Sequence, residues 1–269
     1  MSENGLQLIK ENGWRCGLSN MLRKENGRWW GTKKWIIQAI LWTFIVNGML
    51  AMILFLVAGT VATQTGTVLT TGEKIEMGMQ GFFNVAGLGF AMGAAILTHD
   101  IIISERETGT AAWIMSKPVS RKAFIISKFA ANAIALLSIL IFLQGAIAYG
   151  QFSIVNGAPM PVIPFITAMG VLALICLFYV ALMFMVGTLT TSRGLALGVS
   201  LGIIFAGQII PSIIKETVYV TPWALSNIAN AIMAGSPLPA ELLAPIFVTM
   251  ALSVIFLGYS MWKFEIIEL

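Results

Sequence analysis

Residues 162–190 read VIPFITAMGVLALICLFYVALMFMVGTLT and contain no charged side chain. A helix of this length crosses the hydrocarbon core of a bilayer, because ~20 residues suffice at a rise of ~1.5 Å per residue. Of the 269 residues in the chain, 58% are hydrophobic and only 10% are charged. Soluble domains carry roughly 25% charged residues. The sequence therefore predicts an integral membrane protein.

Five more apolar runs of at least 20 residues flank this one on both sides. The six predicted spans cover residues 35–62, 78–98, 129–155, 162–190, 195–214 and 240–262. We therefore expect an all-α membrane protein with one six-span transmembrane domain over residues 35–269. A polar, amphipathic N-terminal region, residues 1–34, precedes this domain.

The basic residues predict the orientation of the chain in the membrane. Of the 16 Lys and Arg residues, only Lys74 and Lys215 fall on one side of the predicted spans. Basic residues concentrate on the cytoplasmic side of membrane proteins. We therefore expect both termini in the cytoplasm and the protein in the plasma or inner membrane. The same rule explains the net charge of +4 without a nucleic-acid partner.

The outer segment 215–239 carries signals of a short helix before the sixth span. Thr221 is a candidate cap, Pro222 suits the first helical position, and Gly235 is a stop signal. The apolar face of this helix comprises Leu225, Ile228, Ala229 and Ile232. This pattern predicts a helix that lies in the outer interface or re-enters the membrane.

The predicted spans lack the groups that ion-coupled transport and catalysis require. They contain no Lys, Arg, Asp or His, and Glu241 at an outer edge is their only acid. Ion-coupled carriers commonly keep an ionisable residue within the membrane. The single histidine, His99, has no partner at metal-ligand spacing. We therefore expect no enzyme activity, metal or bound cofactor, and an energy source outside this chain.

Uncharged amides within the spans have two interpretations. They either join helices by hydrogen bonds or line a translocation path. The residues concerned are Asn47, Asn84, Asn132, Gln144 and Gln208.

Small residues recur every four positions in the fifth span. Gly194, Gly198 and Gly202 share one helical face that permits close helix contact. This face can serve a contact within the monomer or a dimer seam, and the pattern alone favours neither.

The inner loop 99–128 is longer than a simple connection between adjacent spans requires. Gly109 can end the helix that continues from the second span, and Thr110 can cap a new helix over residues 111–117. Within this short helix, Trp113 and Ile114 present apolar surface. Such surface suggests docking to a partner or to the membrane surface.

The end of the same loop also contains helix stop and start signals. Pro118 ends the short helix, because the residue before a proline disfavours helical geometry. Ser120 is then a candidate cap for the helix that enters the membrane. The loop therefore predicts three helices in succession, with the middle one crossing between the other two.

The runs ERETGT (105–110) and KPVSR (117–121), together with Lys128, resemble the inner loop of type-2 ABC exporter permeases. Ser127 departs from that pattern, since the family often has Gly there. The resemblance implies two permeases, identical or close paralogues, paired with two separate ATPase subunits that bind ATP and Mg. It further implies that residues 111–117 form the coupling helix and that the first and fifth spans form the dimer contact.

These observations lead to one hypothesis and two alternatives. The hypothesis is the permease subunit of an ABC exporter that works by alternating access. Glu105 and Arg121 would contact the ATPase or brace the loop, and Trp113 would be the apolar anchor. The alternatives are a mechanotransmitting ABC subunit that transports nothing itself and an uncoupled carrier or channel. The substrate is not predicted.

Overall fold

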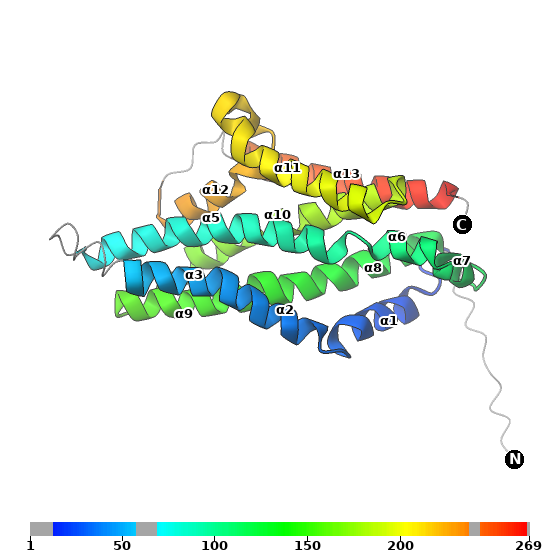
Figure 1. Ribbon diagram of the computed structural model, residues 1–269, viewed down its shortest axis with the longest axis horizontal. Helices are drawn as coiled ribbons and strands as arrows, with labels where there is room; N and C mark the ends of the chain where they lie inside the picture. Colours follow the sequence, from blue (N-terminus) through cyan, green and yellow to red (C-terminus); the bar gives the residue numbers. More distant parts are fainter. Residues whose placement is uncertain (1–12, 58–68, 237–242, 268–269) are drawn as a thin grey trace, which may run out of the picture.

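The computed structural model describes residues 13–57, 69–236 and 243–267. Every regular element in these ranges is helical, and the helices form an elongated bundle (Figure 1). Six segments are long and apolar enough to cross a membrane. They are Lys34–Val57, Thr71–Glu107, Arg121–Asn156, Val162–Leu189, Arg193–Ile213 and Ala244–Ile266. The prediction of an all-α chain with six candidate spans is confirmed.

A separate helix precedes the spans; the first span then alternates between α-helix and π-helix (η1, η2), and a turn at residues 99–100 divides the second. Helix α1 (Leu18–Trp30) comes first. The first span then consists of α2 (Lys34–Trp42), η1 (Thr43–Asn47), α3 (Gly48–Ala51) and η2 (Met52–Val57). The second span consists of α5 (Thr71–Thr98) and α6 (Ile101–Glu107). Residues 58–62 of the predicted first span lie outside the described residues.

The remaining spans follow the predicted order, but the third begins at Arg121, eight residues before its predicted start. The third span comprises α8 (Arg121–Leu136), η3 (Leu137–Leu143) and α9 (Gln144–Asn156). The last three are α10 (Val162–Leu189), α11 (Arg193–Ile213) and α13 (Ala244–Ile266). Residues 240–242 of the predicted sixth span are not among the described residues. Four short elements connect the spans: α7 (Thr110–Met115), η4 (Lys215–Tyr219), η5 (Pro222–Ala224) and α12 (Leu225–Met233).

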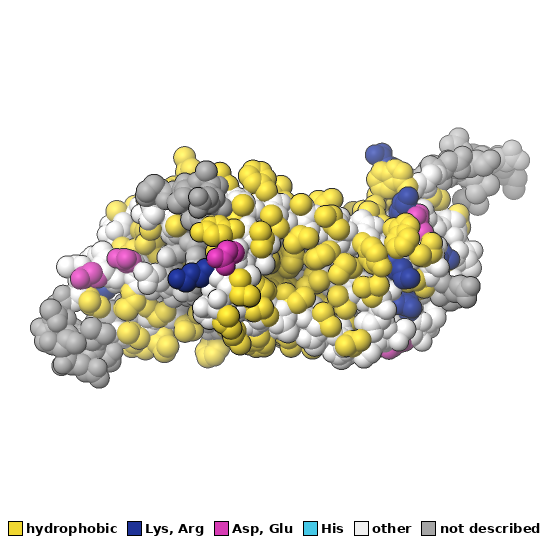
Figure 2. Space-filling view, turned by 90° about the horizontal axis from the view of Figure 1, so that it is seen from above, with side chains coloured by type: hydrophobic (Ala, Val, Ile, Leu, Met, Phe, Trp, Pro, Cys, Tyr) yellow, Lys and Arg dark blue, Asp and Glu magenta, His cyan; other side chains and the backbone are white. Residues whose placement is uncertain are grey.

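Helix α10 forms the centre of the bundle. It packs against α13, α12, α5 and α8, and most of its side chains are buried. In contrast, few residues of α11 and α13 are fully buried. Figure 2 shows hydrophobic side chains across the middle of one face and charged side chains toward its two ends. This distribution suits a protein whose middle lies in hydrocarbon.

The helix of the outer segment packs against the candidate spans. Leu225, Ile228 and Ala229 of α12 are buried against the bundle, where α12 contacts α5 and α10. Gly235 follows with a positive φ of 68°, as a stop signal requires. Thr221 and Pro222 occupy the N-cap and first helical positions of η5, as expected, but the Thr221 hydroxyl makes no capping bond and donates to the Thr217 carbonyl at 2.6 Å. Residues 237–239 of the predicted segment lie outside the described residues.

Candidate functional site

Helix α7 lies at the end of the bundle where α1 begins and α13 ends (Figure 1). Gly109 precedes it with a φ of 68°, a left-handed conformation that glycine adopts at little cost. Thr110 does not cap the helix as expected. It is the first helical residue, and its hydroxyl bonds the Thr108 hydroxyl at 2.8 Å. The helix ends at Met115, two residues before the expected end.

The two apolar residues singled out on α7 point in different directions. The Trp113 side chain is 60% exposed, whereas Ile114 is buried with 4% exposed. The Lys117 ammonium lies 3.7 Å from the centre of the Trp113 ring. Helix α7 therefore rests on the bundle through Ile114 and offers Trp113 outward, as a docking surface requires.

A cluster of charged side chains, three of them buried and one half-exposed, joins the helices next to α7. Lys128 of α8 is fully buried, and its ammonium lies 2.7 Å from Glu105 Oε1 and 2.8 Å from Glu25 Oε1. Arg28 of α1 also reaches Glu105 Oε1, at 3.0 Å. We call these four residues the brace cluster. It joins α1, α6 and α8, and its charges pair because a buried charge without a partner is strongly unfavourable.

The Trp29 indole and the Asn132 amide form a further contact between α1 and α8. The Trp29 Nε1 donates to Asn132 Oδ1 at 2.9 Å, and Asn132 Nδ2 donates to the Lys128 carbonyl at 2.7 Å. Both side chains are buried. Of the two interpretations of the amides, this geometry matches helix joining for Asn132.

The two residues after Glu105 reach different elements. Arg106 donates to the carbonyl of Thr190, at the end of α10, at 3.4 Å. The Arg193 Nε at the start of α11 donates to Glu107 Oε2 at 2.9 Å. Three consecutive side chains of α6 thus tie it to α1 and α8, to the end of α10 and to the start of α11.

Two residues between α7 and α8, Pro118 and Ser120, form hydrogen bonds with the N-terminal segment of the described chain. Ser120 caps α8 by accepting a bond from the Ala123 amide at 2.9 Å, as expected, and its hydroxyl donates to the Trp14 carbonyl. The Cys16 thiol donates to the Pro118 carbonyl at 2.8 Å. These bonds fix the N-terminal segment against the loop.

Arg121 binds the opposite chain end. Its guanidinium donates to the carbonyls of Phe264, Glu265 and Ile267 at 3.1, 2.8 and 2.7 Å. Glu105 and Arg121 therefore both make bracing contacts within the protomer. Sequence reasoning missed Glu25 and Arg106. Glu25 lies 103 positions from Lys128, and no local pattern could link the two residues.

Two of the predicted amides bind each other. Asn47 Nδ2 donates to Gln144 Oε1 at 2.7 Å, and both side chains are buried. The bond joins the first span to the third. In the described structure, this pair forms a contact between helices.

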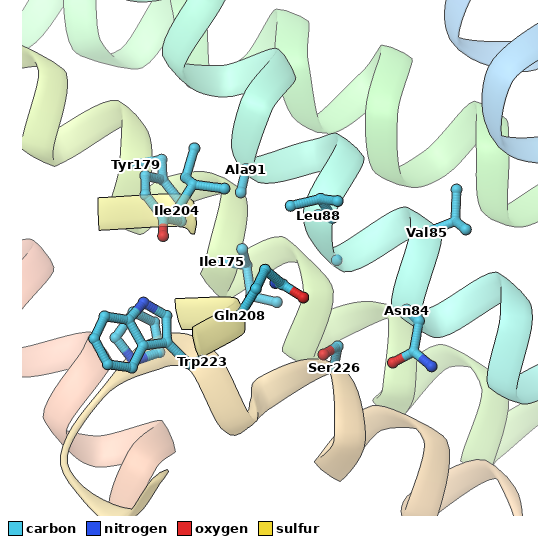
Figure 3. Close-up of a pocket in the computed structure, with 12 residues that line it drawn as sticks. Asn84, Val85, Leu88, Ala91, Ile175, Tyr179, Ile204, Gln208, Trp223 and Ser226 are labelled. Atoms are coloured by element: carbon cyan, nitrogen blue, oxygen red, sulfur yellow. The ribbon is translucent and has the colours of Figure 1, made fainter. Parts of the chain in front are cut away.

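The other two amides, Asn84 and Gln208, line a cavity of about 230 Å³ between α5, α10, α11 and the outer segment (Figure 3). Tyr179, Trp223 and Ser226 add further polar groups to the wall. The described lining residues are all uncharged. Such a cavity can hold an uncharged ligand with both apolar and hydrogen-bonding parts.

Two glycines allow the outer segment to approach the spans around this cavity. A Cβ at Gly87 of α5 would lie 2.8 Å from Ser226 Cβ, and one at Gly207 of α11 would lie 2.6 Å from Trp223 Cγ. Both separations are too short for carbon atoms. Glycine at these positions therefore permits the close packing of Trp223 and Ser226.

The glycine face of α11 lies open on the protomer. Gly194, Gly198 and Gly202 are exposed, and a Cβ at Gly198 or Gly202 would meet no atom of the described structure within 4 Å. This face therefore serves no close helix contact within the described protomer.

The helical bundle and its candidate spans define a multi-pass membrane protein. The chain belongs to the ABC-2 transporter family: the family described as ABC-2 family transporter protein matches residues 31–265. It is thus the membrane subunit of an ABC transporter and not an enzyme, because these subunits are not catalytic. No curated protein matches the sequence. Among the described residues, no group of three or more His, Cys, Asp or Glu side chains could hold a metal ion.

Proposed function

We propose that this ABC-2 subunit is the permease of an exporter driven by separate ATPase subunits, which dock on α7. The single observation that carries the proposal is the 60% exposed Trp113 on a short helix that the bundle braces from behind. A large exposed aromatic side chain on a supported helix is typical of an interface anchor. In this arrangement ATP and Mg are held by the partner, and α7 lies in the cytoplasm together with both termini.

The contacts of α6 and α8 supply a route for force from α7 to the spans. A displacement of α7 moves α6, which is tied through Glu105 to α1 and α8, and through Arg106 and Glu107 to α10 and α11. Because Arg121 is hydrogen-bonded to the end of α13, the same displacement would also move α13. Rigid-body rocking of two permease copies would then give alternating access.

The open glycine face and the uncharged cavity complete the proposal. Gly198 and Gly202 of α11 form the seam with a second copy or a close paralogue, since nothing in the described protomer covers them. Asn84 and Gln208 contact the transported molecule in the cavity of Figure 3. The direction of transport, export, follows the resemblance of residues 105–110 and 117–121 to exporter permeases.

Substitution of the proposed anchor tests the docking site. Trp113→Ala should weaken binding of the ABC ATPase in native membranes by ~30-fold, because loss of a central interface aromatic costs ~2 kcal/mol. Trp262→Ala is the matched control, since Trp262 on α13 is 54% exposed but lies outside α7. Equal ATPase binding by the two variants and the parent would refute docking through Trp113.

A further inference from the structure

A second cavity, of about 330 Å³, lies between α1, the start of α2 and the start of α6. Its wall contains two cationic side chains, Arg28 and Lys34, and two carboxylates, Glu25 and Asp100. Thr32 and Ser104 add hydroxyl groups. A volume of this size lies at the lower end of the range for small-molecule sites, ~300–1,000 Å³.

Lys34 and Asp100 face this cavity without binding each other. The Lys34 ammonium lies 4.3 Å from the centre of the Trp29 ring and interacts electrostatically with Asp100. The ion pairs within 4.0 Å among the described residues do not include this pair. Glu25 and Arg28, in contrast, are already paired in the brace cluster. The cavity therefore offers one uncommitted cation and one uncommitted anion.

The cavity lies where a candidate span begins and another one breaks. Lys34 is the first residue of the first span, and Asp100 separates α5 from α6 in the second. Trp29 lines the cavity. Trp30, the next residue in the sequence, packs its ring against that of Trp35. Tryptophan and lysine gather at the headgroup level of membranes. The position therefore suits a ligand that belongs to the membrane interface.

We propose that this cavity binds a phosphoethanolamine group, with its phosphate at Lys34 and its ammonium at Asp100. The ligand must carry both charges, because a purely anionic headgroup would leave the Asp100 carboxylate unmatched and repelled. A choline group has no N–H to donate to this carboxylate, whereas a primary ammonium has three. Phosphatidylethanolamine carries this group in a bilayer, and free phosphoethanolamine carries it in water.

Native mass spectrometry of the full chain from nanodiscs tests the assignment. The bilayer should contain equal parts of phosphatidylethanolamine, phosphatidylglycerol and phosphatidylcholine. We expect the protein to retain phosphatidylethanolamine in preference to the other two lipids. Lys34→Gln and Asp100→Asn should each lower this retention about tenfold, as expected when a charge-assisted contact is lost. Lys33→Gln is the matched control, because Lys33 is an exposed neighbour that does not line the cavity.

Two results would overturn the proposal. One is equal or greater retention of phosphatidylglycerol or phosphatidylcholine by the unaltered chain. The other is retention in Lys34→Gln or Asp100→Asn that equals retention in Lys33→Gln. Added free phosphoethanolamine separates the two sources of the group. If free phosphoethanolamine displaces phosphatidylethanolamine, the headgroup alone is sufficient for binding. If the protein retains phosphatidylethanolamine, the whole lipid is the ligand.

Discussion

The Lys128 ammonium and the Glu105 carboxylate meet 2.7 Å apart in the interior of the bundle, on the helices that precede and follow α7. Lys128 is fully buried, and Glu105 is 6% exposed. Their contact closes the base of the α6–α7–α8 segment, and Glu25 joins α1 to the same point. The two helices that flank α7 are therefore tied to each other and to α1 by these ion pairs.

Replacing the central cation should destabilise the protein strongly. Lys128→Met leaves two buried carboxylates, Glu25 and Glu105, with Arg28 as their one remaining cation in the brace cluster, and removal of one member of a buried ion pair costs ~3–5 kcal/mol. The loss is measurable as a lowered midpoint of thermal unfolding in detergent. Lys122→Met is the control, because Lys122 is exposed and its ion pair is with the exposed Glu265.

A triple variant separates charge from packing. Lys128→Met combined with Glu25→Gln and Glu105→Gln removes the two buried carboxylates and leaves only the half-exposed Arg28, which water can solvate, so it should recover part of the lost stability. Lys128→Met with the same unfolding midpoint as Lys122→Met would show that the brace cluster does not stabilise the bundle.

A methyl group at Gly207 should disturb the outer segment. Alanine normally stabilises a helix relative to glycine by ~1 kcal/mol. At Gly207, however, the added Cβ would lie 2.6 Å from Trp223 Cγ, so Trp223 must move and packing is lost, at a cost of ~1–3 kcal/mol. Gly207→Ala should therefore lower the unfolding midpoint. Gly258→Ala, where a Cβ meets nothing within 4 Å, should not. Equal midpoints for the two variants would contradict the packing of Trp223 on α11.

Two asparagines should respond differently to the same change. Asn47→Leu removes the partner of the buried Gln144 side chain and should cost ~1 kcal/mol of stability, the scale of a hydrogen bond between membrane helices. Asn84→Leu should cost little, because Asn84 is exposed at the cavity. Unfolding midpoints of the two variants in the same detergent provide the measurement. A larger loss for Asn84→Leu would reverse the assignment.

The glycine face of α11 should control association of two copies. Gly198→Leu should reduce the dimer fraction in nanodiscs, while the monomer keeps its fold, because a side chain there meets no described atom. Gly258→Leu on α13 is the matched control, since its site is equally open. Mass photometry gives the dimer fraction directly. An unchanged dimer fraction for Gly198→Leu would place the seam elsewhere.

The six spans could be predicted from sequence because each is a long apolar run, and hydrocarbon requires such a run whatever its neighbours are. Local signals also located α7, since Gly109 and Pro118 limit a helix through backbone geometry alone. Capping was less predictable. Ser120 caps α8, but the hydroxyls of Thr110 and Thr221 found other partners.

The contacts between distant segments could not be predicted in this way. Lys128 has the sequence signature of a basic residue in a cytoplasmic loop, yet it is buried because Glu25 and Glu105 converge on it in three dimensions. Likewise, Asn47 and Asn84 are similar amides in apolar runs. Only the packing of the spans distinguishes the one that binds Gln144 from the one that lines a cavity.

A photo-crosslinking amino acid at position 113 tests the docking of the ATPase on α7 most directly. The experiment uses the intact complex in native membranes, with the same amino acid at position 262 of α13 as the reference, and mass spectrometry identifies the captured protein. We predict an ABC ATPase crosslinked from position 113 and none from position 262. An ATPase that copurifies with the chain but is captured equally from both positions, or from neither, would contradict docking on α7.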